Sequence, residues 1–161
     1  MRIGVVSDTH NHLGNVGRIV DLFNAAGVAR VVHTGDITQP KTLEAFARLE
    51  APLFGVYGNN DLERPALESA AGRHGIALCD PPLELHWAER HIVVVHDPLD
   101  LAHALADHHH LALHGHNHEH VEEWREGCLV FNPGECAGHL PGLNAIGIVD
   151  LAALSAERLR F

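Results

Sequence analysis

The stretches RIGVVSDTH (residues 2–10) and RVVHTGD (residues 30–36) decide how this chain begins to fold. Each contains a short run of β-branched residues that is followed by an aspartate, Asp8 in the first and Asp36 in the second. The segment between them, Val16–Ala26, has the apolar spacing of an amphipathic helix. A strand, a helix and a second strand in this order predict two parallel strands joined by a helical crossover. The chain therefore begins as an α/β protein.

The alternation of strands and helices continues through two-thirds of the chain and then stops. It predicts helices at Thr42–Leu49, Pro65–His74 and Leu99–His108, and strands at Leu53–Tyr57, Leu83–His86, His91–His96 and Leu111–His114. The last third predicts only strands, at Val121–Arg125, Cys128–Asn132, Asn144–Asp150 and Arg158–Phe161, with tight turns at Ala88-Glu89-Arg90 and Glu126-Gly127. These late strands favour a second, more antiparallel sheet packed face to face on the first, with helices outside.

Length and composition exclude several classes of protein. The chain has 161 residues, of which 46% are hydrophobic and 20% charged, and we expect one globular domain over residues 1–161. No apolar run approaches the roughly 18 residues of a membrane span, and the first run is too short for a secretory signal. A formal net charge of −10 argues against binding long nucleic acid. Three cysteines without a C-x-x-C pair suit the reducing cytoplasm.

Polar side chains that can bind metal ions follow five of the expected strands. Loops that leave the carboxyl ends of such strands converge, so these side chains should meet in one crevice. The candidate ligands are Asp8, His10, Asp36, Asn59, His96, His116 and His118. Each alone is explained by a turn or a helix cap, but the joint pattern is not. Carboxylates, imidazoles and an amide suit a divalent transition ion, since the set is too rich in nitrogen for calcium and has no thiolate.

Five motifs carry a resemblance to a known family. They are Ser7-Asp8-Thr9-His10, Gly35-Asp36, Gly58-Asn59-Asn60-Asp61, Gly115-His116-Asn117-His118 and Asn132-Pro133-Gly134-Glu135-Cys136, together with His96. In this order and spacing they resemble the calcineurin-like metallophosphoesterases, especially small bacterial and archaeal phosphodiesterases. The resemblance implies a four-layer α/β/β/α sandwich of two mixed sheets flanked by helices. It also implies that Asp8, His10 and His118 bind one ion, that Asn59, His96 and His116 bind another, and that Asp36 bridges them.

The resemblance further implies a metal-dependent phosphoesterase, and a phosphodiesterase rather than a phosphomonoesterase. We expect two divalent ions per chain that hydrolyse a small phosphodiester or nucleotide through a metal-activated hydroxide. Mn²⁺ and Fe suit the mixed donors best, with Zn²⁺ and Ni²⁺ as alternatives. Neither a membrane nor long nucleic acid is expected as a partner, and a homo-oligomer stays open. The rival functions are a binding scaffold without catalysis and a histidine-rich metal buffer. All seven ligand positions are filled and spread over five strand ends, which argues against both.

Two departures from the family pattern concern the chemistry. Asn60 stands where many relatives carry a histidine that is proposed to protonate the leaving oxygen; an amide can donate a hydrogen bond to phosphate but cannot act as a general acid. Asn60 is therefore our candidate substrate-binding and catalytic residue. Asp61 is expected to act beside it by orienting a ligand such as His10 or His96. Asp97-Pro98 follows His96 where relatives have glycine.

For seven other histidines we expect roles other than metal binding. His108-His109-His110 is expected to end a helix, where such groups suit the helix dipole, rather than to form a further metal site. His33 and His114 precede glycines and are expected to be buried with their hydrogen bonds satisfied. His12 and His120 flank the motifs, either in support of a ligand or simply exposed.

Overall fold

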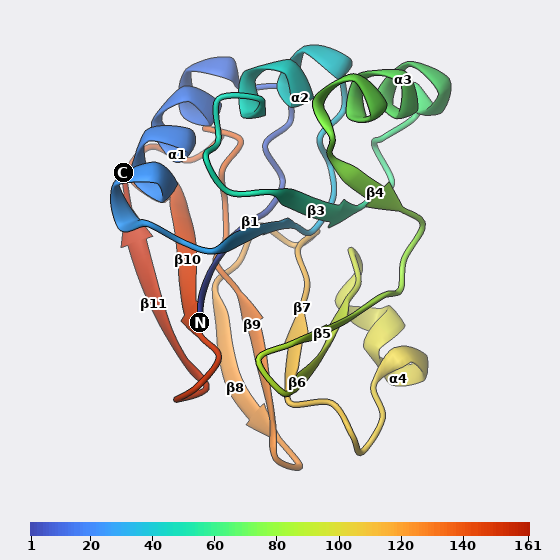
Figure 1. Ribbon diagram of the computed structural model, residues 1–161, viewed down its shortest axis with the longest axis vertical. Helices are drawn as coiled ribbons and strands as arrows, with labels where there is room; N and C mark the ends of the chain where they lie inside the picture. The colour runs from blue at the N-terminus through green and yellow to red at the C-terminus, as the bar shows by residue number, and fades with distance from the viewer.

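Two β-sheets lie face to face in the computed structural model, which describes residues 1–161 (Figure 1). The strands are β1 Arg2–Val6, β2 Arg30–His33, β3 Leu53–Val56, β4 Ala77–Cys79, β5 Leu83–Trp87, β6 Arg90–Val94, β7 Leu111–Leu113, β8 Val121–Arg125, β9 Cys128–Asn132, β10 Ala145–Asp150 and β11 Ser155–Arg160. The helices are α1 Leu13–Ala26, α2 Pro40–Phe46, α3 Arg64–His74 and α4 Leu101–Ala104, with a 3₁₀ turn at Pro98–Asp100. The first sheet has the order β11-β10-β1-β2-β3-β4 and the second the order β5-β6-β7-β9-β8.

Three hydrophobic cores separate four layers. Helices α1, α2 and α3 cover the outer face of the first sheet, where Phe23 and Phe46 are buried (Figure 1). Side chains alternate along β1, so that Ile3 and Val5 face the other way, into the core between the sheets. The outer face of the second sheet is covered only by the short helix α4, whose Leu101 packs in the third core. The expected four-layer α/β/β/α sandwich is confirmed, with a thin fourth layer.

The first sheet contains two strands that were predicted for the second. The β-α-β prediction is confirmed, because β1, β2, β3 and β4 pair in parallel. However, β10 pairs antiparallel with β1, and β11 with β10. Residues 145–149 of β10 are all buried, and such a strand needs neighbours on both edges and both faces. A place between β1 and β11 supplies them, so the prediction that all late strands join the second sheet is wrong. That second sheet is mixed, since β6, β7 and β9 are parallel.

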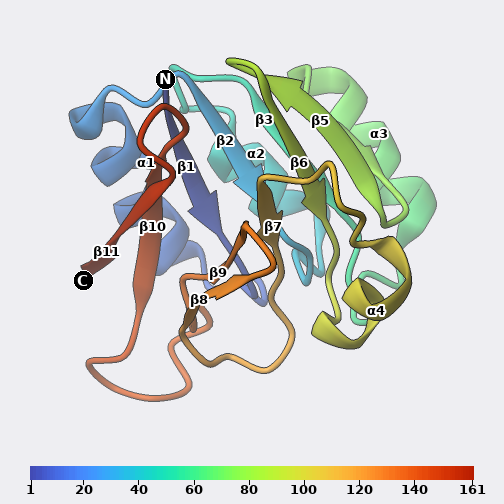
Figure 2. The same cartoon turned by 90° about the horizontal axis from the view of Figure 1, so that it is seen from below.

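The helix predicted over Leu99–His108 is much shorter than expected. Asp97 accepts a hydrogen bond from the backbone N–H of Leu99 (2.8 Å) and begins the 3₁₀ turn; α4 then ends at Ala104, because Leu105 is extended. The three histidines at 108–110 therefore lie in the connection to β7 and not at a helix end, and their interpretation as dipole partners is wrong. Figure 2 shows α4 and this connection beside β6 and β7.

Both predicted hairpin turns are present. Ala88 and Glu89 have φ of 49° and 62°, and Glu126 and Gly127 have φ of 49° and 90°. Positive φ at both central residues is the type I′ geometry that matches the twist of antiparallel strands. The turns join β5 to β6 and β8 to β9. No helix of the structure has the length and apolarity needed to cross a membrane.

The packing of β1 against α1 generates a prediction for two glycines. A Cβ at Gly4 would lie 2.5 Å from the buried ring of Phe23, whereas a Cβ at Gly72, exposed on α3, would meet nothing within 4 Å. We expect Gly4→Ala to lower the free energy of unfolding by about 1–3 kcal/mol through overpacking. Gly72→Ala should raise it by up to about 1 kcal/mol through helix propensity. Urea denaturation measures both, and equal effects would contradict the packing argument.

Candidate metal centre

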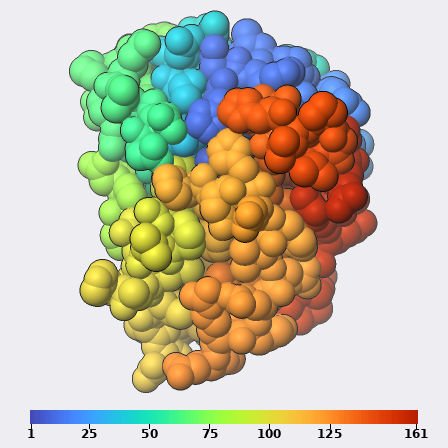
Figure 3. Space-filling view, turned by 180° about the vertical axis from the view of Figure 1, so that it is seen from behind, coloured from blue at the N-terminus to red at the C-terminus, as the bar shows by residue number.

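All seven predicted ligands meet where the two sheets adjoin. Their loops follow β1, β2 and β3 of the first sheet and β6 and β7 of the second. On the face shown in Figure 3, segments that are far apart in the sequence, coloured blue, yellow to light orange, and deep orange, lie against one another. The convergence predicted from the strand ends is thus present in the structure.

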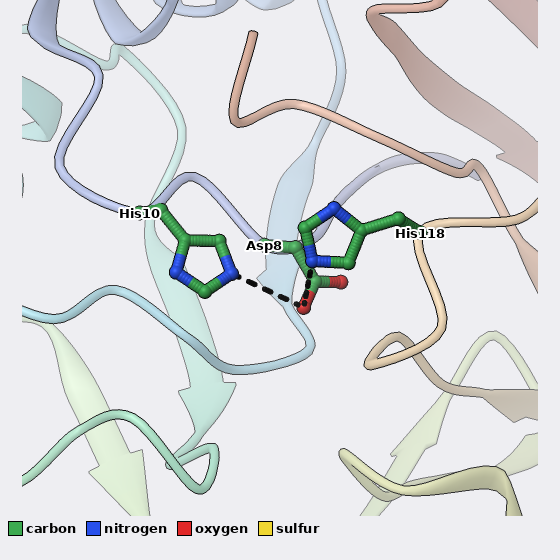
Figure 4. A group of neighbouring side chains, drawn as sticks. All are labelled: Asp8, His10 and His118. Carbon is green, nitrogen blue, oxygen red and sulfur yellow. Dashed lines mark ion pairs between the residues drawn. The ribbon is translucent and has the colours of Figure 1, made fainter. Parts of the chain in front are cut away.

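Asp8 is the centre of the first group of donors. Its Oδ1 lies 3.9 Å from Nε2 of His10 and 3.7 Å from Nε2 of His118 (Figure 4). The Asp8 side chain is completely buried, and its carboxylate accepts hydrogen bonds from the hydroxyl of Ser7 and from the backbone N–H of His116 (3.0 Å). A residue of the first sheet is thereby tied to a loop of the second. The ligand atoms of Asp8, His10 and His118 are close enough to hold one metal ion.

Asp36 lies between two imidazoles from different loops. Its Oδ2 is 3.3 Å from Nε2 of His10, and its Oδ1 is 3.5 Å from Nε2 of His96. Asn60 donates to both oxygens, from its backbone N–H to Oδ1 (2.9 Å) and from Nδ2 to Oδ2 (2.7 Å). Each Asp36 oxygen therefore faces a different group of candidate ligands.

The third group consists of Asn59, His96 and His116. Oδ1 of Asn59 lies 2.9 Å from Nε2 of His96 and 2.9 Å from Nδ1 of His116, and these two nitrogens are 3.2 Å apart. Three lone-pair atoms from three loops point at one another. That arrangement leaves lone pairs facing each other unless a proton or a cation lies between them.

Two of the imidazoles are oriented by partners outside the donor groups. Nδ1 of His96 donates to the carbonyl of Thr34 (2.9 Å), and Nδ1 of His118 donates to Oε2 of Glu135 (2.9 Å). Because each acceptor fixes the proton on Nδ1, the lone pair of Nε2 faces the site, as in metal-binding histidines. Burial acts to raise the pKa of Glu135, but hydrogen bonds from His118 and from the backbone outweigh it and leave this pKa lowered.

Asp61 contacts neither His10 nor His96, the two imidazoles that we expected it to orient, but holds the backbone of the candidate ligand Asp36. Its carboxylate accepts three backbone N–H groups, from Asp36 (3.0 Å), Thr38 (2.6 Å) and Gly58 (2.6 Å), and makes no hydrogen bond to an imidazole. Burial raises the pKa of Asp61, and the three hydrogen bonds oppose that rise. The side chain turned to the backbone because unpaired buried N–H groups are costly. It joins the loop that contains Asp36 to the loop after β3.

The donor set fits bound cations. Four carboxylates, those of Asp8, Asp36, Asp61 and Glu135, are between 0 and 2% exposed, and none pairs with a lysine or arginine. Nε2 of His10 is the single buried side-chain polar atom without a hydrogen-bond partner, and it faces Asp8 and Asp36. Burial lowers the pKa of His10 against the opposing pull of these carboxylates, so its lone pair stays available. Carboxylate charge together with a free imidazole lone pair suits a divalent transition ion.

The ligand loops carry strained backbone. Five of the seven candidates have left-handed φ, at values of 50° (Asp8), 39° (His10), 59° (Asp36), 74° (His116) and 57° (His118). For residues other than glycine this conformation costs roughly 1–2 kcal/mol each, and it concentrates at functional sites. Side chains at the adjacent glycines are excluded: a Cβ at Gly115 would overlap Ser7, and one at Gly58 would overlap Asp36.

Four histidines outside the ligand set make hydrogen bonds that stabilise the surrounding loops. His33 and His114 are buried with hydrogen bonds, as expected. The exposed His12 caps α1 by accepting the N–H of Asn15 (3.1 Å), and Nδ1 of His120 donates to the carbonyl of Asn132 (3.0 Å). Neither of these two contacts a candidate ligand, so both lie outside the site.

Two residues near the ligands were missed by sequence reasoning. Glu135 belongs to the motif at residues 132–136, but its contact with His118 spans 17 positions and has no local signal in the sequence. His139 stacks on His118, with ring centroids 5.5 Å apart and an interplanar angle of 10°. It also lies 5.6 Å from the ring of His10. A histidine in a loop gave no sequence signal for this stacking.

A pocket of about 310 Å³ opens beside the third donor group. It is lined by Tyr57, Gly58, Asn59, Arg64, Pro81, His96, Asp97, Asp100 and His116. Asp97-Pro98, which departs from the family pattern, does not displace His96 from the third donor group. Oδ2 of Asp97 lies 3.9 Å from Nε2 of His116. A hollow of similar size (about 270 Å³) near Pro82 and His103 contains none of the seven candidate ligands, so the adjoining ligands, and not the volume, make the first the candidate substrate pocket.

Comparison with known proteins gives a consistent picture. The profile of the calcineurin-like phosphoesterase superfamily domain matches residues 1–153. The Methanocaldococcus jannaschii protein named Phosphodiesterase MJ0936 is 35% identical over 157 residues, which cover 93% of each chain. The solved structure of an archaeal phosphodiesterase superposes over 100% of both chains, with a TM-score of 0.89 and 31% identity. The E. coli phosphoesterase Yfce shares the fold over 99% of this chain and 98% of its own, with a TM-score of 0.73 and 20% identity.

His33 generates a prediction for the dependence of stability on pH. Its Nδ1 accepts the N–H of Gly35 (3.1 Å), Nε2 lies 3.0 Å from the hydroxyl of Thr9, and burial lowers its pKa from 6.5 to about 3. Because the folded state holds this ring neutral, its contribution is complete above about pH 6.5 and falls as the pH drops towards 3. We expect a loss of about 1.4 kcal/mol per pH unit in that range.

The comparison is between metal-free wild type and His33→Gln in urea titrations at pH 7 and pH 4. The stability advantage of the wild type should shrink by about 3 kcal/mol on going to pH 4, because glutamine does not titrate. The exposed His74→Gln should follow the wild type at both values. Parallel curves for wild type and His33→Gln would show that burial of His33 does not control this dependence.

Proposed function

This chain belongs to the calcineurin-like phosphoesterase superfamily, and on that basis we propose that it is a metal-dependent phosphodiesterase acting on small phosphodiesters or nucleotides. One observation carries the proposal: the two oxygens of Asp36 face different imidazoles, those of His10 and His96, at 3.3 and 3.5 Å. A carboxylate placed in this way is suited to join two neighbouring ions. Centres of two ions that both contact phosphoryl oxygens are typical of phosphatases and nucleases.

We assign the ligands by their contacts. Asp8, His10 and His118 would hold one ion, Asn59, His96 and His116 the other, and Asp36 would contact both. Two divalent ions bound there supply an activated water and neutralise charge on the phosphoryl oxygens. The mixture of carboxylate, amide and imidazole donors favours Mn²⁺ or Fe, with Zn²⁺ or Ni²⁺ as alternatives. No side chain of the chain is needed as a nucleophile.

Asn60 is our substrate-binding residue. It is exposed at the edge of the Asp36 site, and its Nδ2 can donate to a phosphate oxygen. Unlike an imidazolium, it has no proton to give to a departing alkoxide. Asp61 acts by holding the backbone of Asp36 and Gly58, and is a positioning residue.

The adjoining pocket supports a small anionic substrate. Its volume of about 310 Å³ is near the lower end for small-molecule sites. Arg64 on its wall lies 3.7 Å above the ring of Tyr57 and pairs with Asp80 at 2.7 Å. This guanidinium gives the pocket a cationic group on a chain with a net charge of −10, which repels long nucleic acid.

We also propose that the protein works in a reducing compartment, the cytoplasm. All three cysteines are unpaired. Burial raises the pKa of Cys128 to about 11 and that of Cys136 to about 12, so both thiols stay protonated and act as small apolar side chains.

The proposed function is tested by removing Asp36. Metal-loaded wild type should hydrolyse an activated aryl phosphodiester, and Asp36→Ala should lower kcat by at least about 100-fold because both donor groups lose a ligand. Elemental analysis at saturation should show Asp36→Ala losing occupancy at both positions, whereas His118→Ala chiefly empties one. The exposed His74→Ala is the control for removing a histidine. A wild type that never holds more than one ion at the centre would contradict the proposal.

The amide at position 60 generates a second test, on the leaving group. Without a protein acid there, the rate should rise steeply as the leaving alcohol becomes more acidic. General acid catalysis contributes about 10²–10⁴-fold, so Asn60→His should recover part of this for alkyl esters and change nitrophenyl esters little. Rates are compared across several leaving groups at equal metal loading. A wild-type rate that ignores leaving-group acidity, with chemistry rate-limiting, would mean that another residue supplies the proton.

A further inference from the structure

A second cluster of histidines lies at the opposite end of β6 from the metal centre. His91 is the second residue of this strand, and His96 lies two residues beyond its end. Five extended residues span about 16 Å, so the two clusters share no ligand. His91 alternates with Val93 and Val95 of the third core, so the cluster lies on the outer face of the second sheet. Figure 1 shows the β5–β6 hairpin next to the connection from α4 to β7. The proposed phosphodiesterase function makes no use of it.

The ring of His91 contacts two other imidazoles of this cluster, one across the hairpin and one from the connection. His86 and His91 are directly opposed in the β5–β6 register, and their rings stack with centroids 4.4 Å apart. The ring of His108, from the connection, meets that of His91 edge-on at 5.2 Å. Partial loss of solvent and repulsion from neighbouring imidazoles lower the pKa of His91. Neutral imidazoles held together in this way are the form that binds metal.

A carboxylate completes the donor set. Glu84 precedes His86 by two residues and therefore lies on the same face of β5. Its ligand oxygen and a ring nitrogen of His108 are within 4.8 Å of each other. Glu84, His86 and His108 are exposed and His91 is half-buried, so the side chains can turn toward a common ion.

Two further histidines hold this arrangement in place. The buried His109 accepts the N–H of Ala106 at Nδ1 (2.9 Å), so its proton is on Nε2, which donates to Oε2 of Glu84 (2.8 Å). His109 is thereby unsuited to be a ligand but orients the carboxylate, as supporting residues do in metal sites. Nδ1 of His110 accepts the backbone N–H of His91 (3.1 Å), which fixes the connection to β6.

We propose that Glu84, His86, His91 and His108 form a second metal site that binds one Zn²⁺ ion independently of the first. Three imidazoles and one carboxylate match the donors and the number that tetrahedral zinc takes in proteins. Imidazole-rich sites favour zinc over manganese, which prefers oxygen donors. A bound ion would join the hairpin to the α4–β7 connection.

The experiment counts Zn²⁺ per chain by equilibrium dialysis and elemental analysis. Wild type should hold one ion more than Glu84→Gln or His108→Ala. Each substitution should weaken the Zn²⁺ affinity of the second site by at least about 100-fold, because loss of a residue that only supports a ligand costs at most about that much. Both substitutions are at exposed positions and leave the catalytic centre untouched. Turnover of an aryl phosphodiester should therefore equal that of the wild type.

His103→Ala is the matched control, because His103 is an exposed histidine of α4 that lines a different hollow. It should retain the full number of ions. Equal zinc counts in wild type, Glu84→Gln and His108→Ala would overturn the proposal, as would an equal loss in His103→Ala, which would indicate general binding to surface histidines. In an Asp36→Ala background, which weakens the first centre, the extra ion should persist. If the phosphodiesterase proposal is wrong, the metal-loaded protein will show no turnover, but the difference in zinc count between wild type and these variants will remain.

Discussion

Two buried aspartates, in the loops that follow the adjacent strands β1 and β2, impose the constraint on which the rest of the structure depends. Asp8 and Asp36 are 0 and 2% exposed at the junction of the sheets, and neither pairs with a lysine or arginine. An uncompensated carboxylate in a protein interior is costly, so donors or cations must surround each one. The N–H groups of His116 and Asn60 supply part of this compensation. Because His116 follows β7 of the second sheet, its hydrogen bond to Asp8 requires the two sheets to meet at this point.

The strained ligand backbone is held by hydrogen bonds between loops. The N–H of Asp8 donates to the carbonyl of Gly35 (3.1 Å), and that of His10 to the carbonyl of Asp36 (3.0 Å). On the second sheet the N–H of Gly115 donates to the carbonyl of His96 (3.0 Å). Asp61 joins a third loop to these. Left-handed conformations persist only where surrounding structure determines them, and here the hydrogen bonds between neighbouring loops do so.

The histidines of this chain take different roles because their ring nitrogens have different partners. In His96 and His118 an acceptor holds the proton on Nδ1 and leaves Nε2 facing other donors. In His33 and His109 Nδ1 accepts a backbone N–H, which places the proton on Nε2 and makes these rings supports rather than ligands. Residue type is identical in all four. The partner of Nδ1 determines which ring nitrogen carries the proton, and this distinguishes a histidine that can bind metal from one that supports its neighbours.

The sequence by itself determined what depends on neighbouring residues. Apolar periodicity gave the β-α-β start, and Glu126-Gly127 a tight turn, because strand, helix and turn preferences are local. The seven candidate ligands could be named because they directly follow strands. Tertiary structure alone decided that β10 pairs with β1, since a strand does not specify its partner, and that Asp61 binds backbone N–H groups. It also decided that Glu135 reaches His118 and that His91 meets His108, because both contacts join residues separated by 17 positions that only folding brings together.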